Sequence, residues 1–341
     1  MGSVDWPLEE LVDYKPDQTK ADDFDAFWDG LCEASDEVAL NAEFTPVSDT
    51  LPLANVYDVA FDGVDGVRVR GWFLTPKDVA EPLPAVVQFI GYTGGRDCPH
   101  LLSAHVLNGF CAFIMDSRGQ GGHTGQALAT SHGAQRGFIT HGILGRDEYY
   151  YKNFYLDARR AIDVVRARDE VDGERIAAIG GSQGGALTIA CAALSSHVKV
   201  MAPDVSWLSH FRRSLDLAVG PYEEITDFMK RYPDRIEDAF ETLAYFDNMN
   251  LVSRVKVSHA YYSVGLWDAI CPPSTVYASY NWLPDQVEKT IEVYPYNGHE
   301  GGGNLHQQRK LEWLRTVKKR RSRFFWSAFF ICRALVILGP H

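Results

Sequence analysis

The sequence predicts an α/β protein with a doubly wound, mostly parallel sheet. Short apolar segments alternate with helical patterns along most of the chain, which is typical of such sheets. A Gly-rich pentapeptide joins one apolar segment to an Ala-rich one, and Asp and His candidates follow two later segments. The 341 residues could form one large domain with insertions or two small domains. A hydrophobic content of 46% with 23% charged residues allows a sizeable core.

The pentapeptide at 180–184, Gly-Gly-Ser-Gln-Gly, is the most informative motif. It fits Gly-x-Ser-x-Gly, a sharp strand-to-helix turn that exposes the Ser hydroxyl at the top of a sheet. An apolar strand candidate (175–179) precedes it and a helix candidate (185–194) follows it. The turn is crowded, so small residues must flank the Ser. The motif therefore predicts Ser182 as the nucleophile of an α/β-hydrolase fold, and the alternative is a Gly-rich loop with a structural Ser.

A Ser hydroxyl needs a base to take its proton and a third group to orient that base. In this fold the partners follow in the order Ser, acid, His. Asp268 follows a strand candidate at 260–264, and His299 follows another at 290–294. Active-site residues of open α/β sheets collect at this edge. Flanking glycines also let the backbone bring the imidazole in from its loop. The order and context therefore predict Asp268 and His299 as the partners of Ser182.

Other acids and histidines compete for these roles. Asp247 and Asp285 are rival acids, but neither directly follows a predicted strand. Asp268 itself could instead cap the helix that follows it. His306 falls inside the last predicted helix, where a solvated surface His is expected, and His259 would begin a strand.

An acyl-transfer site also needs an oxyanion hole. The backbone N–H after the nucleophile, that of Gln183, is one expected donor. The other is the N–H of Tyr92, in the Gly-rich loop that follows the strand candidate 84–90. The alternative for that loop is a plain strand-to-helix turn, and a phosphate loop is excluded because no Gly-Lys-Ser/Thr follows. We further expect Tyr92, Trp207 and Trp267 to restrict the acyl pocket to short chains.

Composition limits the partners. A net charge of −12 and a pI near 5.4 argue against nucleic acid and acidic polymers as ligands. The cysteines form no Cys-x-x-Cys pair, and their spacing resembles neither a zinc site nor a disulfide framework. The N-terminus lacks the basic and apolar regions of a signal peptide. These observations predict a cytoplasmic protein, and the proposed chemistry needs no metal or organic cofactor.

The predicted organisation is a single domain over 1–317 with two additions. Residues 1–50 read as an N-terminal extension, and 206–251, rich in aromatic and charged residues, as a helical insertion over the sheet. The remaining expected elements are a hairpin at 55–61 and 67–74, a strand at 110–115, and helices at 147–168, after 272–273 and at 305–317.

The C-terminal segment 318–341 differs in composition from the rest of the chain. A basic cluster leads into an apolar run that Arg333 interrupts and that is shorter than the roughly 20 residues of a membrane span. Three interpretations stay open: a membrane-surface tail, a subunit contact, and a cloning or frameshift scar.

These residues together resemble the cephalosporin C deacetylase and acetyl xylan esterase family, carbohydrate esterase family 7. The likeness runs from about residue 5 to 317. The matching motifs are Arg118-Gly119-Gln120, Gly180-Gly181-Ser182-Gln183-Gly184, His299-Glu300, the acid loop 265–268 with 272–275, and the N-terminal segments 8–11 and 24–28.

The resemblance implies enzymes that deacetylate small esters, including acetylated xylo-oligosaccharides and cephalosporin C. It also implies cytoplasmic homohexamers whose sites face an inner cavity. The family's triad and oxyanion donors carry over onto the residues already identified. Arg118 and Gln120 are expected to hold loops rather than react, because Arg cannot act as a base at ordinary pH. One departure is Ile90 in place of the family's usual His, which puts in doubt the hydrogen bonding behind the oxyanion hole.

Two other functions are compatible with the predicted fold. A serine peptidase of the prolyl oligopeptidase type shares the fold, but 341 residues leave no room for its substrate-selecting domain. A non-catalytic binding protein of this fold usually lacks a triad member, whereas all three candidates are present here. The sequence does not decide the physiological substrate.

Overall fold

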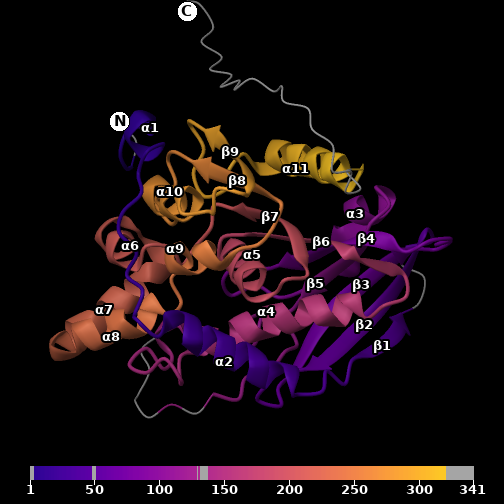
Figure 1. Ribbon diagram of the computed structural model, residues 1–341, viewed down its shortest axis with the longest axis horizontal. Helices are drawn as coiled ribbons and strands as arrows, with labels where there is room; N and C mark the ends of the chain where they lie inside the picture. The colour runs from indigo at the N-terminus through magenta and orange to yellow at the C-terminus, as the bar shows by residue number, and fades with distance from the viewer. Residues whose placement is uncertain (1–3, 48–50, 129, 131–136, 320–341) are drawn as a thin grey trace, which may run out of the picture.

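The computed structural model describes residues 4–47, 51–128, 130 and 137–319. Its centre is a nine-stranded sheet with the strand order β1-β2-β3-β5-β4-β6-β7-β8-β9 (Figure 1). The strands are β1 Glu43–Val47, β2 Ala54–Asp62, β3 Arg68–Pro76, β4 Leu83–Phe89, β5 Cys111–Met115, β6 Val171–Gly181, β7 Val198–Asp204, β8 His259–Gly265 and β9 Glu288–Tyr294.

The sheet is parallel where the site lies and antiparallel at one end. All pairings from β5 through β9 are parallel, whereas β1, β2 and β3 pair antiparallel with their neighbours. The predicted hairpin is confirmed as β2 and β3. Its turn is closed by the Gly63 N–H, which donates to the Val67 carbonyl at 2.8 Å, and by Gly66 at φ +78°. The mostly parallel α/β fold that the sequence predicts is therefore present, with β1 as an unpredicted edge strand.

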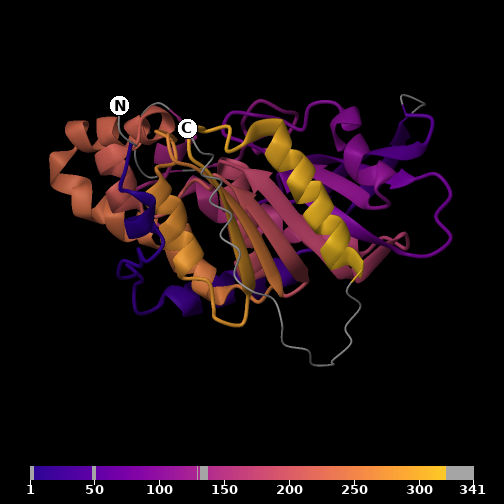
Figure 2. The same cartoon turned by 90° about the horizontal axis from the view of Figure 1, so that it is seen from above.

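Helices cover both faces of the sheet. They are α1 Leu8–Leu11, α2 Phe24–Asp36, α3 Ser103–Leu107, α4 Tyr150–Arg166, α5 Gln183–Leu194, α6 Phe211–Leu217, α7 Glu223–Arg231, α8 Ile236–Ala244, α9 Asn248–Leu251, α10 Pro273–Asn281 and α11 Gly303–Lys319. On one face, α4 and α5 pack side by side against the sheet, and every residue of α5 is buried. This position explains why α5 is apolar all round. On the other face lie α3 and α11, and Figure 2 shows α11 running across the sheet.

The helical insertion lies at one end of the sheet. Helices α6 to α9 connect β7 to β8, as the composition of 206–251 predicts (Figure 1). Asp247 anchors this insertion from inside. Its buried carboxylate accepts the backbone N–H groups of His210 at 2.7 Å, Phe211 at 2.9 Å and Met249 at 2.9 Å. Asp247 thus joins the start of α6 to the start of α9, which accounts for this rival acid without a catalytic role.

The N-terminal extension packs across the insertion and α10. The indole of Trp28 donates to the Tyr245 carbonyl at 2.9 Å, and that of Trp282 donates to the Pro16 carbonyl at 2.7 Å. Asp5 accepts from the backbone N–H of Ser274, in the first turn of α10, at 2.7 Å. These contacts place the extension on the body of the molecule.

The predicted C-terminal tail largely lies outside the described residues, since α11 ends the described chain at Lys319. Within the described ranges, no helix combines the length and the apolar character needed to cross a bilayer.

The insertion anchor predicts a pH-dependent stability. Burial raises the pKa of Asp247 to about 6, although three N–H donors act in the opposite direction. The folded protein therefore holds a proton on this carboxyl between pH 4 and 6 that the unfolded chain releases, so its contribution to stability falls as pH rises through this window. We expect the free energy of unfolding of the wild type, relative to Asp247→Asn, to fall by roughly 2 kcal/mol between pH 4 and 7. Urea unfolding at both pH values measures it, and a difference that stays flat or rises with pH would contradict the assignment.

Candidate active site

Ser182 stands in a strained turn between β6 and α5. Its backbone has φ 57° and ψ −120°, a conformation that non-Gly residues rarely adopt. A Cβ on Gly180 would lie 2.4 Å from the Gly184 carbonyl oxygen, and one on Gly184 would lie 2.3 Å from that of Phe89. The crowding that the pentapeptide predicts is therefore present, and it lifts Ser182 to the carboxyl edge of the sheet.

Asp268 and His299 meet on loops that follow β8 and β9. The Nδ1 atom of His299 lies 2.9 Å from Oδ2 of Asp268. The other oxygen of Asp268, which is fully buried, accepts the backbone N–H groups of Ile270 and Cys271 at 2.8 and 2.9 Å. These bonds fix the carboxylate so that one oxygen faces the imidazole.

Close backbone contact holds the two loops together. The Trp267 N–H donates to the Asn297 carbonyl at 2.9 Å. A Cβ on Gly265 would lie 2.2 Å from the Gly298 carbonyl oxygen, so only Gly fits at the end of β8. The position of the imidazole relative to its acid is thus set by backbone packing.

Two of the three candidate triad residues line one cleft, and Asp268 is buried in contact with the second of them. Ser182 and His299 both line a cleft of about 800 Å³. Because Nδ1 of His299 faces Asp268, Nε2 is the nitrogen available to the Ser hydroxyl. The structure therefore places the candidate nucleophile and base at one cleft, and the candidate acid in contact with that base.

Cys271 is a buried neighbour that the sequence reasoning missed. Its thiol lies beside the Asp268 carboxylate and the His299 imidazole. Burial raises the pKa of Cys271 well above its ordinary value and Asp268 adds to the shift, so the thiol is neutral. The only feature of the sequence that indicates its place near the site is its position three residues after Asp268, in the acid loop.

Cys271 also belongs to the one group of potential metal ligands found among the described residues. Its sulfur, a carboxylate oxygen of Asp268 and a ring nitrogen of His299 lie within 4.8 Å of one another. However, both Asp268 oxygens are already engaged, one by the imidazole and one by two backbone N–H groups. The arrangement matches the needs of an acid–imidazole pair.

The two candidate oxyanion donors lie at the ends of neighbouring strands. Tyr92 follows β4, and Gln183 opens α5 directly after Ser182. The phenol of Tyr92 donates to Glu224 at 2.7 Å and accepts the Phe138 N–H at 2.7 Å. Burial and Glu224 raise the pKa of Tyr92 far above its ordinary value, so it stays protonated. Glu224, on the insertion, is thus a supporting residue that no local motif revealed.

Ile90, the departure from the resembled family, lies just before this loop. Its carbonyl accepts the side-chain amide of Gln183 at 3.3 Å, and its side chain packs with the apolar cluster beside α3. The backbone of Ile90 therefore supports the elbow while its side chain does not.

The two Trp residues expected in the acyl pocket lie elsewhere, which corrects that expectation. Trp207 is buried beside Tyr92, with ring centroids 4.9 Å apart, and its backbone N–H donates to the Ser182 carbonyl at 3.1 Å. Trp267 is 39% exposed on the acid loop. Neither residue lines the cleft, whereas Tyr92 does.

A buried charge cluster lies behind the elbow and also corrects the sequence analysis. His306, expected on the surface, is fully buried, and its Nε2 lies 2.7 Å from Oδ1 of Asp204. Lys310 pairs with the other oxygen. Burial would raise the pKa of Asp204, but Lys310 and His306 outweigh it and hold the pKa below its ordinary value. The Asp204 carbonyl accepts the Ser182 N–H at 3.0 Å, so this cluster fixes α11 to the back of the elbow.

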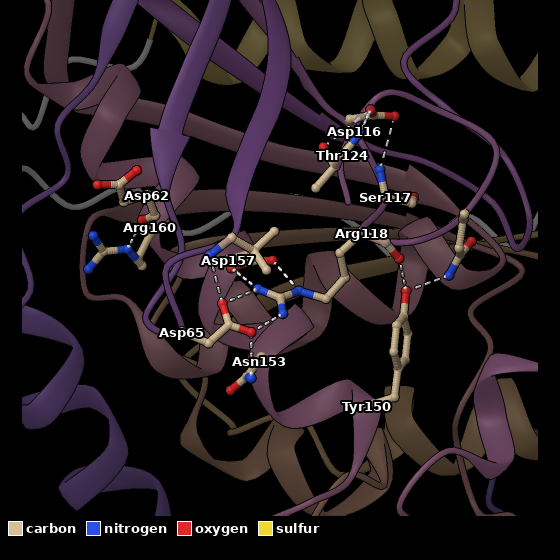
Figure 3. A network of polar contacts seen from close by, with 12 residues as sticks. Asp62, Asp65, Asp116, Ser117, Arg118, Thr124, Tyr150, Asn153, Asp157 and Arg160 are labelled. Atoms are coloured by element: carbon tan, nitrogen blue, oxygen red, sulfur yellow. Dashed lines mark hydrogen bonds and ion pairs between the residues drawn. The ribbon is translucent and has the colours of Figure 1, made fainter. Parts of the chain in front are cut away.

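Arg118, of the Arg-Gly-Gln motif, is a buried hub (Figure 3). Its guanidinium binds Asp157 of α4 at 2.6 and 2.8 Å and Asp65 of the β2–β3 turn at 2.6 Å. Its carbonyl accepts the Tyr150 hydroxyl at 2.6 Å. The side chain and the backbone of Arg118 are both anchored, which supports the expectation that Arg118 holds a loop.

Glu300, which follows His299, is exposed and closes the imidazole loop. Its carboxylate accepts the Asn297 amide at 2.8 Å and the Gly298 N–H at 3.1 Å. The backbone N–H of Glu300 itself and the Asn297 amide lower the pKa of the Glu300 carboxyl, so it carries a charge beside the cleft.

A Ser on a strand–helix elbow, with an Asp–His pair at the carboxyl edge of a mostly parallel sheet, defines an α/β hydrolase. The family model described as acetyl xylan esterase (AXE1) matches residues 1–317. The chain belongs to this family and is a carboxylic ester hydrolase.

Known relatives agree. An acetyl xylan esterase structure from Paenibacillus sp. R4 has a TM-score of 0.88 and 41% identity, covering 91% of this chain and 99% of its own. Acetyl xylan esterase 1 from Thermoanaerobacterium sp. JW/SL YS485 has a TM-score of 0.84 and 34% identity, with 90% and 99% covered. Acetyl esterase Axe7A of Xylanibacter ruminicola is 27% identical over 319 residues, which is 89% of this chain and 69% of that protein.

The buried hub gives a stability prediction. Arg118→Met leaves two carboxylates without their cation, and breaking a buried pair in this way costs about 3–5 kcal/mol. Arg212→Met is the matched control, because the Arg212–Glu237 pair is exposed and is worth less than about 1 kcal/mol. Urea unfolding of both variants tests this. Equal losses in the two variants would show that the hub carries no special share of the stability.

Proposed function

We propose that the protein is a serine esterase that removes acetyl groups from small acetylated substrates such as xylo-oligosaccharides and cephalosporin C. The observation that carries the proposal is the Asp268–His299 pair, at 2.9 Å, beside a cleft that also exposes the elbow residue Ser182. Family membership supplies the acetyl group as the expected acyl part. Because all three candidate triad residues are present, hydrolysis is favoured over a purely binding role.

In the proposed acylation step, the Ser182 oxygen attacks the acetyl carbonyl carbon while Nε2 of His299 takes the hydroxyl proton. Asp268, held by two backbone N–H groups, keeps Nδ1 protonated and stabilises the imidazolium. The N–H groups of Tyr92 and Gln183 would stabilise the oxyanion. Collapse of the intermediate breaks the ester C–O bond, and the imidazolium gives its proton to the departing sugar alcohol.

In the proposed deacylation step, water enters the same cleft. Nε2 of His299 takes a proton from the water molecule while the water oxygen attacks the carbonyl carbon of the acetyl-enzyme. The second tetrahedral intermediate collapses, acetate leaves, and the proton returns to the Ser182 oxygen. The cycle regenerates the free enzyme with side chains and water alone.

We also propose, from family membership, a homohexamer in the cytoplasm. The cysteines Cys32, Cys98, Cys111, Cys191 and Cys271 are free thiols, as suits a reducing compartment. The catalytic domain would span 1–317, the residues that the family model matches.

Replacing the nucleophile tests the proposal. Ser182→Ala should lower kcat/KM at least about 10³-fold for acetate release from both acetylated xylo-oligosaccharides and p-nitrophenyl acetate. Circular dichroism and thermal unfolding of the variant establish that it is folded. Acetate release at the wild-type rate from the folded variant would overturn the assignment of Ser182.

The acyl part of the cleft predicts chain-length selectivity. The Tyr92 ring is fixed by Glu224 and by the Trp207 ring behind it, so it cannot swing aside to admit a longer chain. We expect kcat/KM for p-nitrophenyl octanoate to be at least tenfold below that for the acetate. Comparable values for the two esters would show that Tyr92 does not close the pocket.

A further inference from the structure

The side chain of Gln120 lies where three loops of the site meet. These loops follow β5, β4 and β6, which are adjacent and parallel, so their carboxyl ends lie side by side. The first loop carries Gln120, the second carries the candidate donor Tyr92, and the third carries Ser182 and the second donor, Gln183.

Gln120 bonds to both of the other loops. Its Oε1 accepts the backbone N–H of Thr93 at 2.7 Å and the side-chain amide of Gln183 at 3.1 Å. Its Nε2 donates to Oε1 of Gln183 at 2.9 Å and to the Tyr150 hydroxyl at 2.9 Å. The two glutamine side chains thus form a reciprocal amide pair, and one of them also holds the residue directly after Tyr92.

The direction of each bond is fixed by backbone groups. Oε1 of Gln120 must accept, because Thr93 offers an N–H. Nε2 of Gln120 must donate, because the Tyr150 hydrogen goes to the Arg118 carbonyl. Nε2 of Gln183 must donate, because it also faces the Ile90 carbonyl at 3.3 Å. The network therefore has a single consistent arrangement, and it requires an amide at position 120.

The Thr93 contact falls at a strained point of the backbone. Thr93 has φ 62°, a left-handed conformation that a β-branched residue adopts only when its surroundings hold it there. The loops also touch backbone to backbone: a Cβ on Gly121 would lie 2.4 Å from the Thr93 carbonyl oxygen, and one on Gly95 would lie 2.6 Å from Cα of Gly122. The amide of Gln120 ties down the peptide that follows the Tyr92 N–H.

We propose that Gln120 is a positioning residue that sets the spacing between the two oxyanion donors. Its anchor is the Arg118 hub, which fixes the loop of Gln120 to α4 and to the β2–β3 turn (Figure 3). From this anchor the amide reaches Thr93 on one side and Gln183 on the other. The inference rests on the proposed esterase function, because the spacing has catalytic meaning only if both N–H groups bind the oxyanion.

Three variants separate positioning from general support. Gln120→Met keeps the size and removes every bond, whereas Gln120→Glu keeps the Thr93 contact and loses both donated bonds. Tyr150→Phe leaves Gln120 in place and removes one partner of its Nε2. The matched control is Gln308→Glu, the same chemical change on the exposed face of α11.

The readouts are kcat and KM for p-nitrophenyl acetate and the inhibition constant of a trifluoromethyl ketone, which forms an oxyanion on the Ser. We expect kcat to fall about 10- to 100-fold in Gln120→Met and Gln120→Glu, with KM within about twofold of wild type, because the donors act mainly in the transition state. The inhibition constant should rise by the same factor as kcat/KM falls. Gln308→Glu should match the wild type in all three.

The results distinguish this inference from the proposed function. An active, Ser182-dependent wild type with unchanged kcat and inhibition constant in a folded Gln120→Met would overturn the positioning role alone. If Gln120→Met does not fold, Gln120→Glu decides: a parallel loss of kcat and ketone affinity supports the role, and wild-type values refute it. Loss of activity with unchanged ketone affinity would also refute it, because the donors would then be correctly placed. A wild type without Ser182-dependent activity would instead overturn the esterase assignment.

Discussion

The steric limit at the β6–α5 turn is the constraint on which the rest of the structure depends. Gly180 and Gly184 approach backbone groups so closely that no Cβ fits, and Ser182 is thereby forced to φ 57°. Strain of this kind persists only where the surroundings hold it. The surroundings here are a fully buried α5 and a sheet covered on both faces, so the core of the protein serves to keep one Ser in an unfavourable backbone conformation.

Three buried charged side chains provide the second level of support, and each of the three has bonding partners. Arg118 has two carboxylates, Asp204 has an imidazole and an ammonium, and Asp268 has two backbone N–H groups and the imidazole of His299. A buried charge without such partners would be costly, so these groups specify a particular arrangement of loops. Each group fixes a different loop or helix around the elbow, namely the Gln120 loop, α11 and the imidazole loop.

The sequence predicts what depends on local pattern. Short motifs and their order predict the elbow, the strands and helices around it, and the Asp268–His299 pair.

Prediction from the sequence fails where contacts between distant parts of the chain decide whether a side chain is buried. The periodicity of α11 does not show that His306 turns inward, because its partner Asp204 lies on another element about 100 residues earlier. The Trp residues were misplaced for the same reason: an aromatic side chain near the Ser can line the cleft or pack behind it, and only the direction of the Trp207 backbone decides. The edge strand β1, largely exposed, carries little apolar signal.

The sheet positions the candidate reacting groups, whereas the insertion forms the opposite wall of the cleft. This explains why substrate preference is harder to predict from the sequence than reaction type. The candidate nucleophile, acid and base follow the ends of strands whose positions the parallel sheet dictates. The wall opposite them comes from the insertion, through Glu224 and the residues around Pro221. Because Glu224 fixes Tyr92, which is both a wall of the cleft and a candidate oxyanion donor, a change in the insertion acts on pocket shape and on catalysis together.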